Sequence, residues 1–215
     1  MRLRNVKYAK ELIRSYPNYI VEKPKNHKGK WHDVFNNDNP IEVELGCGKG
    51  KFIYDIAKKN PNINYIGIEK YDSVVVRALE KLILHPLENI KLIRFDATNI
   101  VDIFTNNEIS NIYLNFSDPW PKRKHAKRRL TSPKFLNRFH SVLQNFGNIY
   151  MKTDNYAFFE YSIMQFNNSI HYYIEDISLD LYQKLPKDNI QTEFEIKFTE
   201  RKKPIYYLKT IHKGV

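Results

Sequence analysis

The sequence predicts an α/β fold with a mostly parallel sheet and helices on both of its faces. From Ile41 onward, short apolar runs suited to strands alternate with longer segments suited to helices, the pattern of strand–helix–strand units. Runs such as NIYLNF (111–116) are apolar enough for burial on both faces of a sheet. The last two strand-like runs have no long amphipathic segment between them, so the final strand is predicted to run antiparallel.

The expected elements follow one another closely from residue 41 to the end of the chain. Strands are predicted at 41–45, 63–69, 89–95, 111–116, 148–153, 172–179 and 204–212. Helices are predicted at 51–60, 72–85, 134–146 and 155–168, with a short helical turn near 99–104. Asp72 or Ser73 is expected to cap the second helix. Ser132 is expected to cap the third, with Pro133 at its first position and Gly147 past its end.

The first 39 residues are predicted to form a basic N-terminal arm that is partly helical, and residues 40–215 a single domain. The arm has a helical pattern near its start and is then interrupted by Pro24 and Gly29. A single cysteine excludes an intramolecular disulfide and a cysteine-based zinc site, and the histidines show no metal-ligand spacing. No apolar stretch reaches membrane-spanning length, so we expect a cytoplasmic protein with no membrane partner and no metal.

The net charge of +11 is concentrated in two segments of the chain. Residues 1–30 hold nine Lys or Arg and two Glu, and residues 122–138 hold eight Lys or Arg and no acid. The remainder of the chain therefore carries a slight excess of acids. Clustered cations suit a polyanion, because each neutralised phosphate releases counterions, and this favours a nucleic-acid partner over a merely solvated face.

Acidic residues lie at or beside the ends of the first five predicted strands. In open α/β sheets, ligands bind beyond the carboxyl ends of the strands, so these side chains are expected to line a ligand site. Any one of these acids could instead cap the helix that follows. Asp154, and Asp72 shortly after the second strand, are the strongest candidates for that role. The five strand-end acids are Glu44, Glu69, Asp96, Asp118 and Asp154.

The turn GCGKG (46–50) lets the backbone approach a ligand closely, and Gly46 and Gly48 are its expected contacts. Glu69 at the end of the second strand could accept both hydroxyls of an adenosine ribose, which fits either NAD or S-adenosylmethionine. Glu44 would repel a pyrophosphate but attract a cationic amino group and a sulfonium. The sequence therefore favours S-adenosylmethionine over NAD as the cofactor.

The stretch SDPWPKRKHAKRRL (117–130) places an acid in a stiff turn directly before a cationic run. Prolines on both sides of Trp120 restrict the loop, and Trp120 could stack on a base or anchor the loop to the core. The turn is similar to the acid–Pro–Pro–aromatic turn of methyltransferases that act on exocyclic amines. Six of the next eight residues are Lys or Arg, so phosphates would be held close to the transferred methyl group.

These motifs together resemble those of the bacterial tRNA (guanine-N7)-methyltransferases, over residues 40 to about 210. The matching motifs are VELGCGKGKF, IGIEK, SDPWPKRKHAKRRL, MKTDN and TEFE, and the third is the most specific. The resemblance implies a Rossmann-like class I methyltransferase fold with a central seven-stranded sheet. It also implies S-adenosylmethionine as donor, S-adenosylhomocysteine as product, and a guanosine in the tRNA variable loop as the methylated residue.

The resemblance also implies roles for individual residues, matched motif by motif. Asp118 is the implied catalytic residue and a cofactor contact. The other implied cofactor contacts are Glu44, Gly46, Gly48, Glu69 and Asp96. The implied substrate and RNA contacts are Lys122, Lys124, His125, Lys127, Arg128, Arg129, Asp154, Thr192, Glu193, Phe194 and Glu195. Phe194 replaces the tyrosine that the family usually has, so a hydroxyl is absent there. The chain could act as a monomer or a homodimer.

Guanine N7 has a free lone pair at neutral pH and needs no deprotonation before it attacks a sulfonium methyl group. We therefore expect Asp118 to orient the base and stabilise its developing charge, not to act as a general base. Thr192 and Glu195 have the spacing of a capping box at the start of a helix, although a strand at 193–198 is an alternative. Other functional hypotheses are an exocyclic-amine methyltransferase, a non-catalytic RNA-binding protein and an NAD-dependent oxidoreductase.

Overall fold

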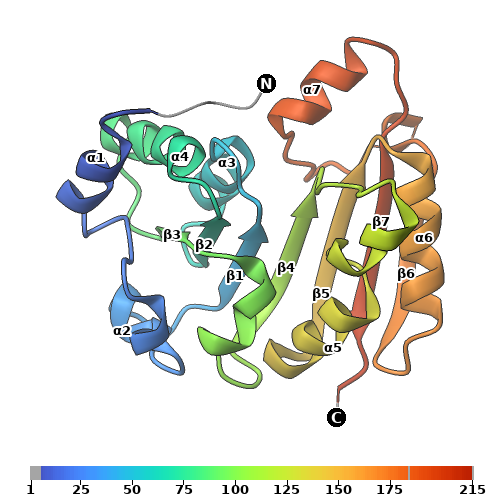
Figure 1. Ribbon diagram of the computed structural model, residues 1–215, viewed down its shortest axis with the longest axis horizontal. Helices are drawn as coiled ribbons and strands as arrows, with labels where there is room; N and C mark the ends of the chain where they lie inside the picture. Colours follow the sequence, from blue (N-terminus) through green and yellow to red (C-terminus); the bar gives the residue numbers. More distant parts are fainter. Residues whose placement is uncertain (1–5, 184, 215) are drawn as a thin grey trace. The chain divides into compact units, whose positions relative to one another are not determined.

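The computed structural model describes residues 6–183 and 185–214, and it consists of two compact units that divide after Thr105. Figure 1 shows the course of the chain. The strands are ordered β3-β2-β1-β4-β5-β7-β6. The predicted fold class is confirmed, because the sheet has seven strands and is mostly parallel. The last strand in the chain, β7, is antiparallel to both of its neighbours. We describe residues up to 105 as the first unit and those from 106 as the second unit.

The first unit is built on three parallel strands, and all five residues of its first strand are buried. Helix α1 packs on α4, and α3 and α4 pack on the strands (Figure 1). The strands are β1 (Ile41–Leu45), β2 (Asn64–Glu69) and β3 (Ile90–Arg94). The helices are α1 (Ala9–Ser15), α2 (Trp31–Phe35), α3 (Lys51–Lys59), α4 (Asp72–Leu84) and the 3-10 helices η1 (Pro24–His27) and η2 (Ala97–Asp102).

The described part of the N-terminal segment belongs to the first unit and packs against its third strand and the residue after η2. Ile20 forms a parallel bridge with Leu92 of β3, where Val21 N donates to Leu92 O at 3.0 Å. The indole of Trp31 is fully buried, and its Nε1 donates to Ile103 O at 2.8 Å. Residues 1–5 of the predicted arm lie outside the described residues, and the boundary at residue 39 stays a prediction.

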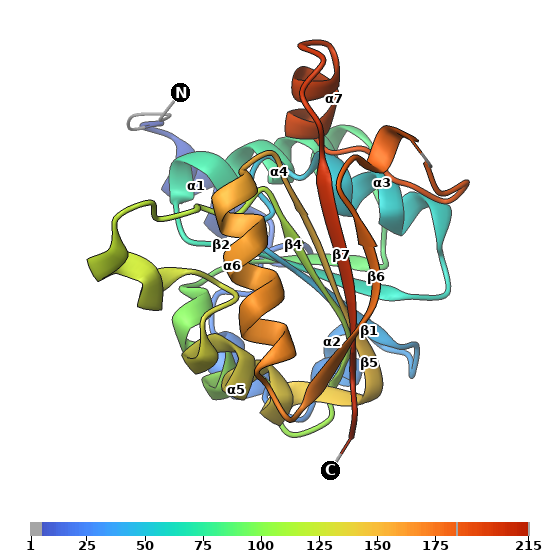
Figure 2. The same cartoon turned by 90° about the vertical axis from the view of Figure 1, so that its right-hand side faces the viewer.

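The second unit contains four strands, and its last strand β7 runs antiparallel to both of its neighbours. Figure 2 shows α6 lying along β6 and β7, with which it is in contact. The strands are β4 (Ile109–Asn115), β5 (Leu143–Thr153), β6 (Tyr172–Ser178) and β7 (Tyr206–His212). The helices are α5 (Pro133–Val142), α6 (Tyr156–Asn167), α7 (Glu193–Thr199) and the 3-10 helices η3 (Arg123–Arg128) and η4 (Leu181–Gln183). None of the helices in the described part of the chain has the length and apolar character needed to cross a bilayer.

The predicted helix at 134–146 is wrong in its last turn. Helix α5 ends at Val142, and Leu143, which is fully buried, begins strand β5 by pairing with Ile109. A Cβ on Gly147 would lie 2.6 Å from Ser110 O, so this glycine permits the close approach of β4 and β5 instead of ending a helix. The burial of Leu143 against β4 cannot be predicted from the neighbouring residues, and it overrides the helical pattern.

Two predicted caps also differ from the structure. The residue before α4 is Tyr71, and Asp72 lies in the first turn, where its carboxylate pairs with Arg94 at 2.9 Å. Ser132 does precede α5, with Pro133 at the first position, but its hydroxyl donates to Lys127 O and makes no capping bond. The Asp72 carboxylate is thus engaged by a tertiary partner that a local pattern cannot reveal, and the Ser132 hydroxyl is engaged by a carbonyl of the preceding loop.

Three histidines of the second unit lie in contact. His212 is fully buried, and its Nδ1 lies 3.0 Å from the carbonyl of Gln144, so Nδ1 carries the proton and Nε2 accepts. His140 Nδ1 lies 2.6 Å from His212 Nε2 and must therefore be the donor of that bond. The rings of His140 and His171 stack with centroids 3.6 Å apart. Burial and the neighbouring imidazoles lower the pKa of His140 and the pKa of His212, so neutral rings are favoured.

We expect the protein to lose stability as the pH falls below the ordinary histidine pKa of 6.5. Because the folded pKa values are lowered, the unfolded chain binds protons first, and the stabilisation is fully present only above that pH. Thermal unfolding at pH 7 and pH 5 measures the loss. His140→Gln should reduce the loss, whereas His85→Gln, at an exposed histidine after α4, should leave it unchanged. An equal loss in all three proteins would contradict the role of the cluster.

Candidate functional site

Three of the predicted cofactor acids lie at one edge of the first unit. Glu44 is on β1, Glu69 is the last residue of β2, and Asp96 follows β3. The three strands are adjacent and parallel, so their carboxyl ends meet at the same edge. Glu44 is buried, while Glu69 and Asp96 are half-buried and reach solvent. The structure thus brings these acids together as the sequence predicted.

The glycine turn is tied to the end of β2 by its backbone. Gly46 N and Cys47 N donate to Ile68 O at 2.8 and 3.1 Å, and Gly48 N donates to Glu69 Oε2 at 3.3 Å. Gly46 and Gly48 have φ values of +78° and +59°, which disfavour other residues. Within the described chain, a Cβ on Gly46 would meet nothing within 4 Å, so the turn leaves room for a ligand to approach its backbone.

Glu69 both holds this turn and retains capacity for a ligand. Its Oε1 accepts from the backbone N–H of Lys70 at 2.8 Å and of Tyr71 at 3.1 Å. A carboxylate has about four acceptor positions, and the hydrogen bonds from Lys70, Tyr71 and Gly48 occupy three. The carboxylate is therefore fixed in place before a ligand binds, and a further lone pair can accept a hydroxyl.

Asp96 is held in its ionised form. Burial by itself would raise the pKa of Asp96, but hydrogen bonds from Lys70 Nζ at 2.7 Å and from Thr98 N at 2.9 Å lower it to about 2. The Asp96 carboxylate also caps η2, whose N-cap residue it is. A fixed anion at this edge suits a ligand that carries positive charge or N–H donors. The described residues contain no group of His, Cys, Asp and Glu that could hold a metal ion.

Asp118 lies in the turn that follows β4 in the second unit. Its side chain is exposed, and no hydrogen bond or ion pair within the described residues engages its carboxylate. The backbone enters the turn through Phe116, whose φ is +50° and whose N–H donates to Lys152 O at 2.8 Å. Trp120, two residues later, has a φ of +42°. Two non-glycine residues in the left-handed region show that the surrounding contacts determine the turn closely.

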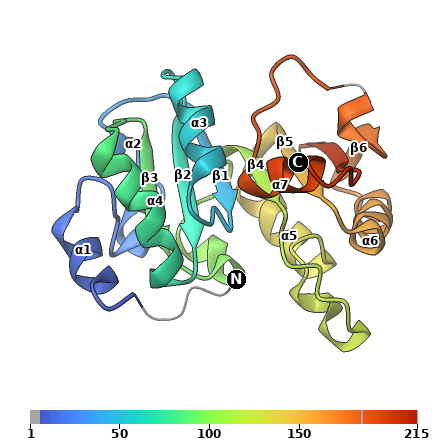
Figure 3. The same ribbon diagram turned by 90° about the horizontal axis from the view of Figure 1, so that it is seen from above.

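The basic segment, which we define as Lys122–Arg129, is divided between structural and exposed cations. Arg129 Nε and Nη2 donate to the carbonyls of Pro119 and Trp120 at 3.0 and 3.1 Å, and its guanidinium lies 4.3 Å from the ring centre of Tyr161. Arg129 therefore clamps the turn to α6. Figure 3 shows that the segment projects away from the strands of its unit.

Trp120 is in contact with two side chains of the basic segment. The guanidinium of Arg128 lies 4.9 Å from its ring centre, and the ring of His125 meets it edge-on at 5.7 Å. Trp120 is thus engaged in organising the loop in this structure. The predicted RNA contacts Lys122, Lys124 and Lys127 are exposed. Their exposure leaves the three ammonium groups accessible to a phosphate, and their role stays a prediction.

A buried ion pair joins β5 to the start of α7. Lys152 Nζ lies 2.9 Å from Glu195 Oε2, and the two side chains are 7% and 0% exposed. Lys152 Nζ also donates to Asn189 Oδ1 and Ile190 O. The Glu195 carboxylate further accepts from Tyr182 OH at 2.9 Å, from Asn189 Nδ2 at 2.7 Å and from Thr192 N at 3.3 Å. These hydrogen bonds occupy both of its oxygens.

The predicted capping box at Thr192 and Glu195 is confirmed, and the alternative strand at this segment is wrong. The two oxygens of Glu195 face the interior, whereas Glu193 and Phe194 are exposed. Asp154 does not cap α6, because Asn155 accepts from Phe158 N in that role. Asp154 is half-buried after β5, and its substrate role stays a prediction.

The sequence analysis missed several residues that build this region. Lys152 stands inside the matched motif MKTDN, but an alternating apolar strand gives no sign of its buried partner. The rings of Phe116 and Phe198 are stacked at 5.7 Å across 82 residues of chain. Arg201 and Lys203 form an exposed basic turn after α7, and the charge run at 201–203 was the signal that could have revealed it.

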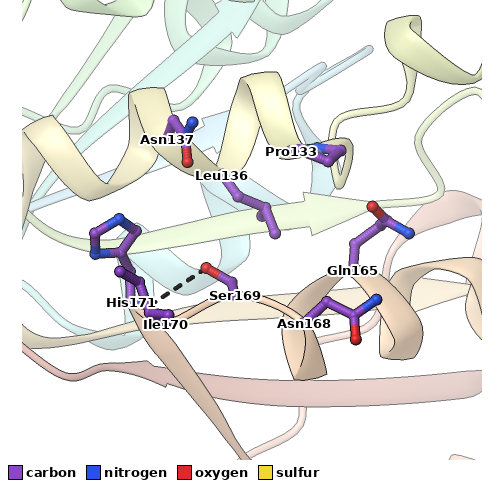
Figure 4. Close-up of a pocket in the computed structure, with 8 residues that line it drawn as sticks. All are labelled: Pro133, Leu136, Asn137, Gln165, Asn168, Ser169, Ile170 and His171. Carbon is purple, nitrogen blue, oxygen red and sulfur yellow. Dashed lines mark hydrogen bonds between the residues drawn. The ribbon is translucent and has the colours of Figure 1, made fainter.

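A pocket of about 290 Å³ lies elsewhere in the second unit, between α5 and the end of α6. Figure 4 shows its lining side chains, with the hydrogen bond from His171 N to Ser169 Oγ. None of the predicted site residues lines it, so we do not assign the function to this pocket. The lining residues are Pro133, Leu136, Asn137, Gln165, Asn168, Ser169, Ile170 and His171.

Comparison with known proteins gives matches over nearly the whole chain. Residues 38–208 match a family described as putative methyltransferase. A tRNA (guanine-N(7)-)-methyltransferase of Geobacillus sp. (strain WCH70) is 50% identical over 206 residues, covering 96% of this chain and 93% of the relative. One of Bacillus cytotoxicus (strain DSM 22905 / CIP 110041 / 391-98 / NVH 391-98) is 48% identical, covering 96% and 94%. The structure of an antibiotic-related methyltransferase is similar with a TM-score of 0.63 and 18% identity, covering 92% of this chain and 98% of that chain, which shows a shared fold.

We expect Lys152→Met to lower the free energy of unfolding by about 3–5 kcal/mol, because it leaves Glu195 charged and buried without its cation. Urea denaturation measures this loss. The double variant Lys152→Met/Glu195→Gln should recover part of it, since the uncompensated charge is then removed. As a matched control, Lys25→Met breaks the exposed pair with Asp102, at 2.8 Å, and should cost less than about 1 kcal/mol. Equal losses at Lys25 and Lys152 would contradict the burial of the second pair as the cause.

Proposed function

We propose that this chain, which belongs to the family of bacterial tRNA (guanine-N7)-methyltransferases, transfers a methyl group from S-adenosylmethionine to N7 of a guanosine in the variable loop of tRNA. The observation that carries the proposal is the 50% identity with such an enzyme over 96% of the chain. That span includes the glycine turn, the turn at Asp118, the basic segment and the capping box.

The proposed donor site uses the carboxylates of the first unit. S-Adenosylmethionine carries a sulfonium, an ammonium group and a ribose, and each is attracted to fixed acceptors. Glu69, preset by three backbone N–H groups, is assigned to a ribose hydroxyl. Glu44 and the ionised Asp96 add the negative charge that favours a cationic donor. Gly46 and Gly48 let the donor approach the backbone.

The proposed RNA site uses the exposed cations of the second unit. Lys122, Lys124 and Lys127 are assigned to phosphates, because each exposed ammonium can release a counterion on binding RNA. Arg129 is assigned mainly to the loop that carries Asp118, since its guanidinium donates to the carbonyls of Pro119 and Trp120 in that loop. Asp154, Glu193 and Phe194 are assigned to the substrate nucleotide.

In the proposed reaction, N7 attacks the methyl carbon in line with the carbon–sulfur bond. The bonding pair stays on sulfur, and the positive charge passes from the sulfonium to the purine. Asp118 is exposed in a closely determined turn, so its carboxylate can accept N–H bonds from the base and stabilise the cation that forms. The base loses no proton, and Asp118 acts as an orienting and electrostatic group.

We expect incubation of the protein with unmodified tRNA and S-adenosylmethionine to yield 7-methylguanosine. Borohydride reduction followed by aniline treatment should then cleave the tRNA at the modified position. Methyl incorporation without strand scission would indicate an exocyclic amine as the acceptor, and no incorporation would contradict the proposed activity. Mapping of the cleavage site tests the variable loop as the target.

Asp118→Asn should lower kcat by roughly 10–100-fold, because the amide is neutral and accepts at only one atom. Single-turnover methylation of tRNA measures the effect. The variant should keep its affinity for the phosphate-bearing parts of tRNA, since the basic segment is unchanged. Glu160→Gln, at an exposed acid on α6, serves as the control and should keep the wild-type rate. Full activity of Asp118→Asn would exclude the assigned role.

A further inference from the structure

Three phenylalanine rings form one stack in the second unit. Phe116 comes directly after β4, and Phe194 and Phe198 belong to α7. The ring centroids of Phe116 lie 5.9 Å from Phe194 and 5.7 Å from Phe198, with interplanar angles of 29° and 27°. Phe194 and Phe198 are 6.3 Å apart, as expected for residues four positions apart on a helix.

The stack has one open ring. Phe194 is 52% exposed, whereas Phe116 and Phe198 are half-buried. Lys203 Nζ lies 5.3 Å from the ring centre of Phe198, so this ring has a cation of the chain over it. A stack that served only to pack α7 against β4 would need its inner rings but not a large aromatic ring half in water.

One residue fixes both sides of the stack. The carbonyl of Lys152 accepts from Phe116 N at 2.8 Å, and its ammonium group binds Glu195, the residue next to Phe194. Phe116 is held at a φ of +50°, a region that non-glycine residues rarely adopt. This constraint and the buried ion pair preset the rings before a ligand arrives. Preset rings lose little conformational freedom when a flat group stacks on them.

We propose that the exposed face of Phe194, supported by Phe116 and Phe198, stacks the purine that is methylated and binds its cationic product form more tightly than its neutral form. The inference rests on the proposed function and assigns the base-stacking surface of that same site. Phe116 stands two residues before Asp118, so the stack is continuous in the chain with the assigned catalytic turn. Bases stack on aromatic side chains whatever their sequence, because every base has a flat face.

The preference for the cation follows from the charge change of the reaction. N7 contributes the lone pair that forms the new N–CH3 bond, and the electrons of the broken S–CH3 bond remain on sulfur. The purine therefore gains one positive charge during transfer. The negative face of a phenyl ring attracts a cation more than a neutral group, so the stack stabilises the transition state more than the bound substrate.

Binding of two nucleotides in the presence of S-adenosylhomocysteine tests the proposal. The probes are 7-methylguanosine 5′-monophosphate and guanosine 5′-monophosphate, titrated calorimetrically. Phe194→Leu should weaken binding of the methylated nucleotide at least about fivefold, and it should weaken binding of the unmethylated nucleotide distinctly less. It should also lower the single-turnover rate on tRNA. Phe194→Tyr keeps the ring and should restore both values to within about twofold of wild type.

Tyr173→Leu removes an exposed aromatic ring on β6 and should change neither binding nor rate. Thermal unfolding of each variant shows whether the fold is kept, and Phe194→Met supplies a second variant without the ring. Unchanged binding in folded Phe194→Leu and Phe194→Met, or equal losses for the two nucleotides, would overturn the inference. Wild-type protein that forms no 7-methylguanosine would instead overturn the proposed function, and the two failures are distinct.

Discussion

The buried ion pair between Lys152 and Glu195 is the constraint on which the second unit's candidate site depends. Two charges withdrawn from water are tolerated only if hydrogen bonds replace the lost hydration, and here Tyr182, Asn189 and Thr192 supply them to the carboxylate. The pair fixes the start of α7 against β5. Through its carbonyl, Lys152 also holds the backbone of Phe116, where the turn to Asp118 begins.

The acids of the chain are used in two physically different ways. Glu195 is fully buried and its two oxygens are bonded within the fold, so its charge serves structure. Glu69 and Asp96 lie at strand ends where backbone N–H groups and Lys70 fix them while they still reach solvent. Asp118 is exposed and makes no such bonds within the described chain. A cationic donor and a base that becomes cationic both suit the second class of carboxylate.

The basic segment shows the same division. Arg129 gives its donors to the carbonyls of the turn, and Arg128 lies over Trp120, so these cations organise the loop that they follow. The exposed side chains of Lys122, Lys124 and Lys127 carry charge and make no such contact with the loop in the described residues. The basic segment, which in sequence is a single cationic run, thus contains a structural clamp and a set of exposed lysines that are proposed to contact phosphates. This arrangement ties the position of Asp118 to the element that is proposed to hold RNA.

The sequence by itself determined the features that depend on neighbouring residues. Apolar periodicity located the strands and most helices, the glycine turn followed from its residues, and Thr192 with Glu195 predicted a capping box that the structure confirms. Tertiary structure decided the rest. Leu143 departs from the predicted helix because it pairs with Ile109 in the sheet. Lys152 pairs with Glu195, which lies 43 residues later in the chain. Such contacts join segments far apart in the chain, and their energy comes from burial and desolvation, which only the folded arrangement defines.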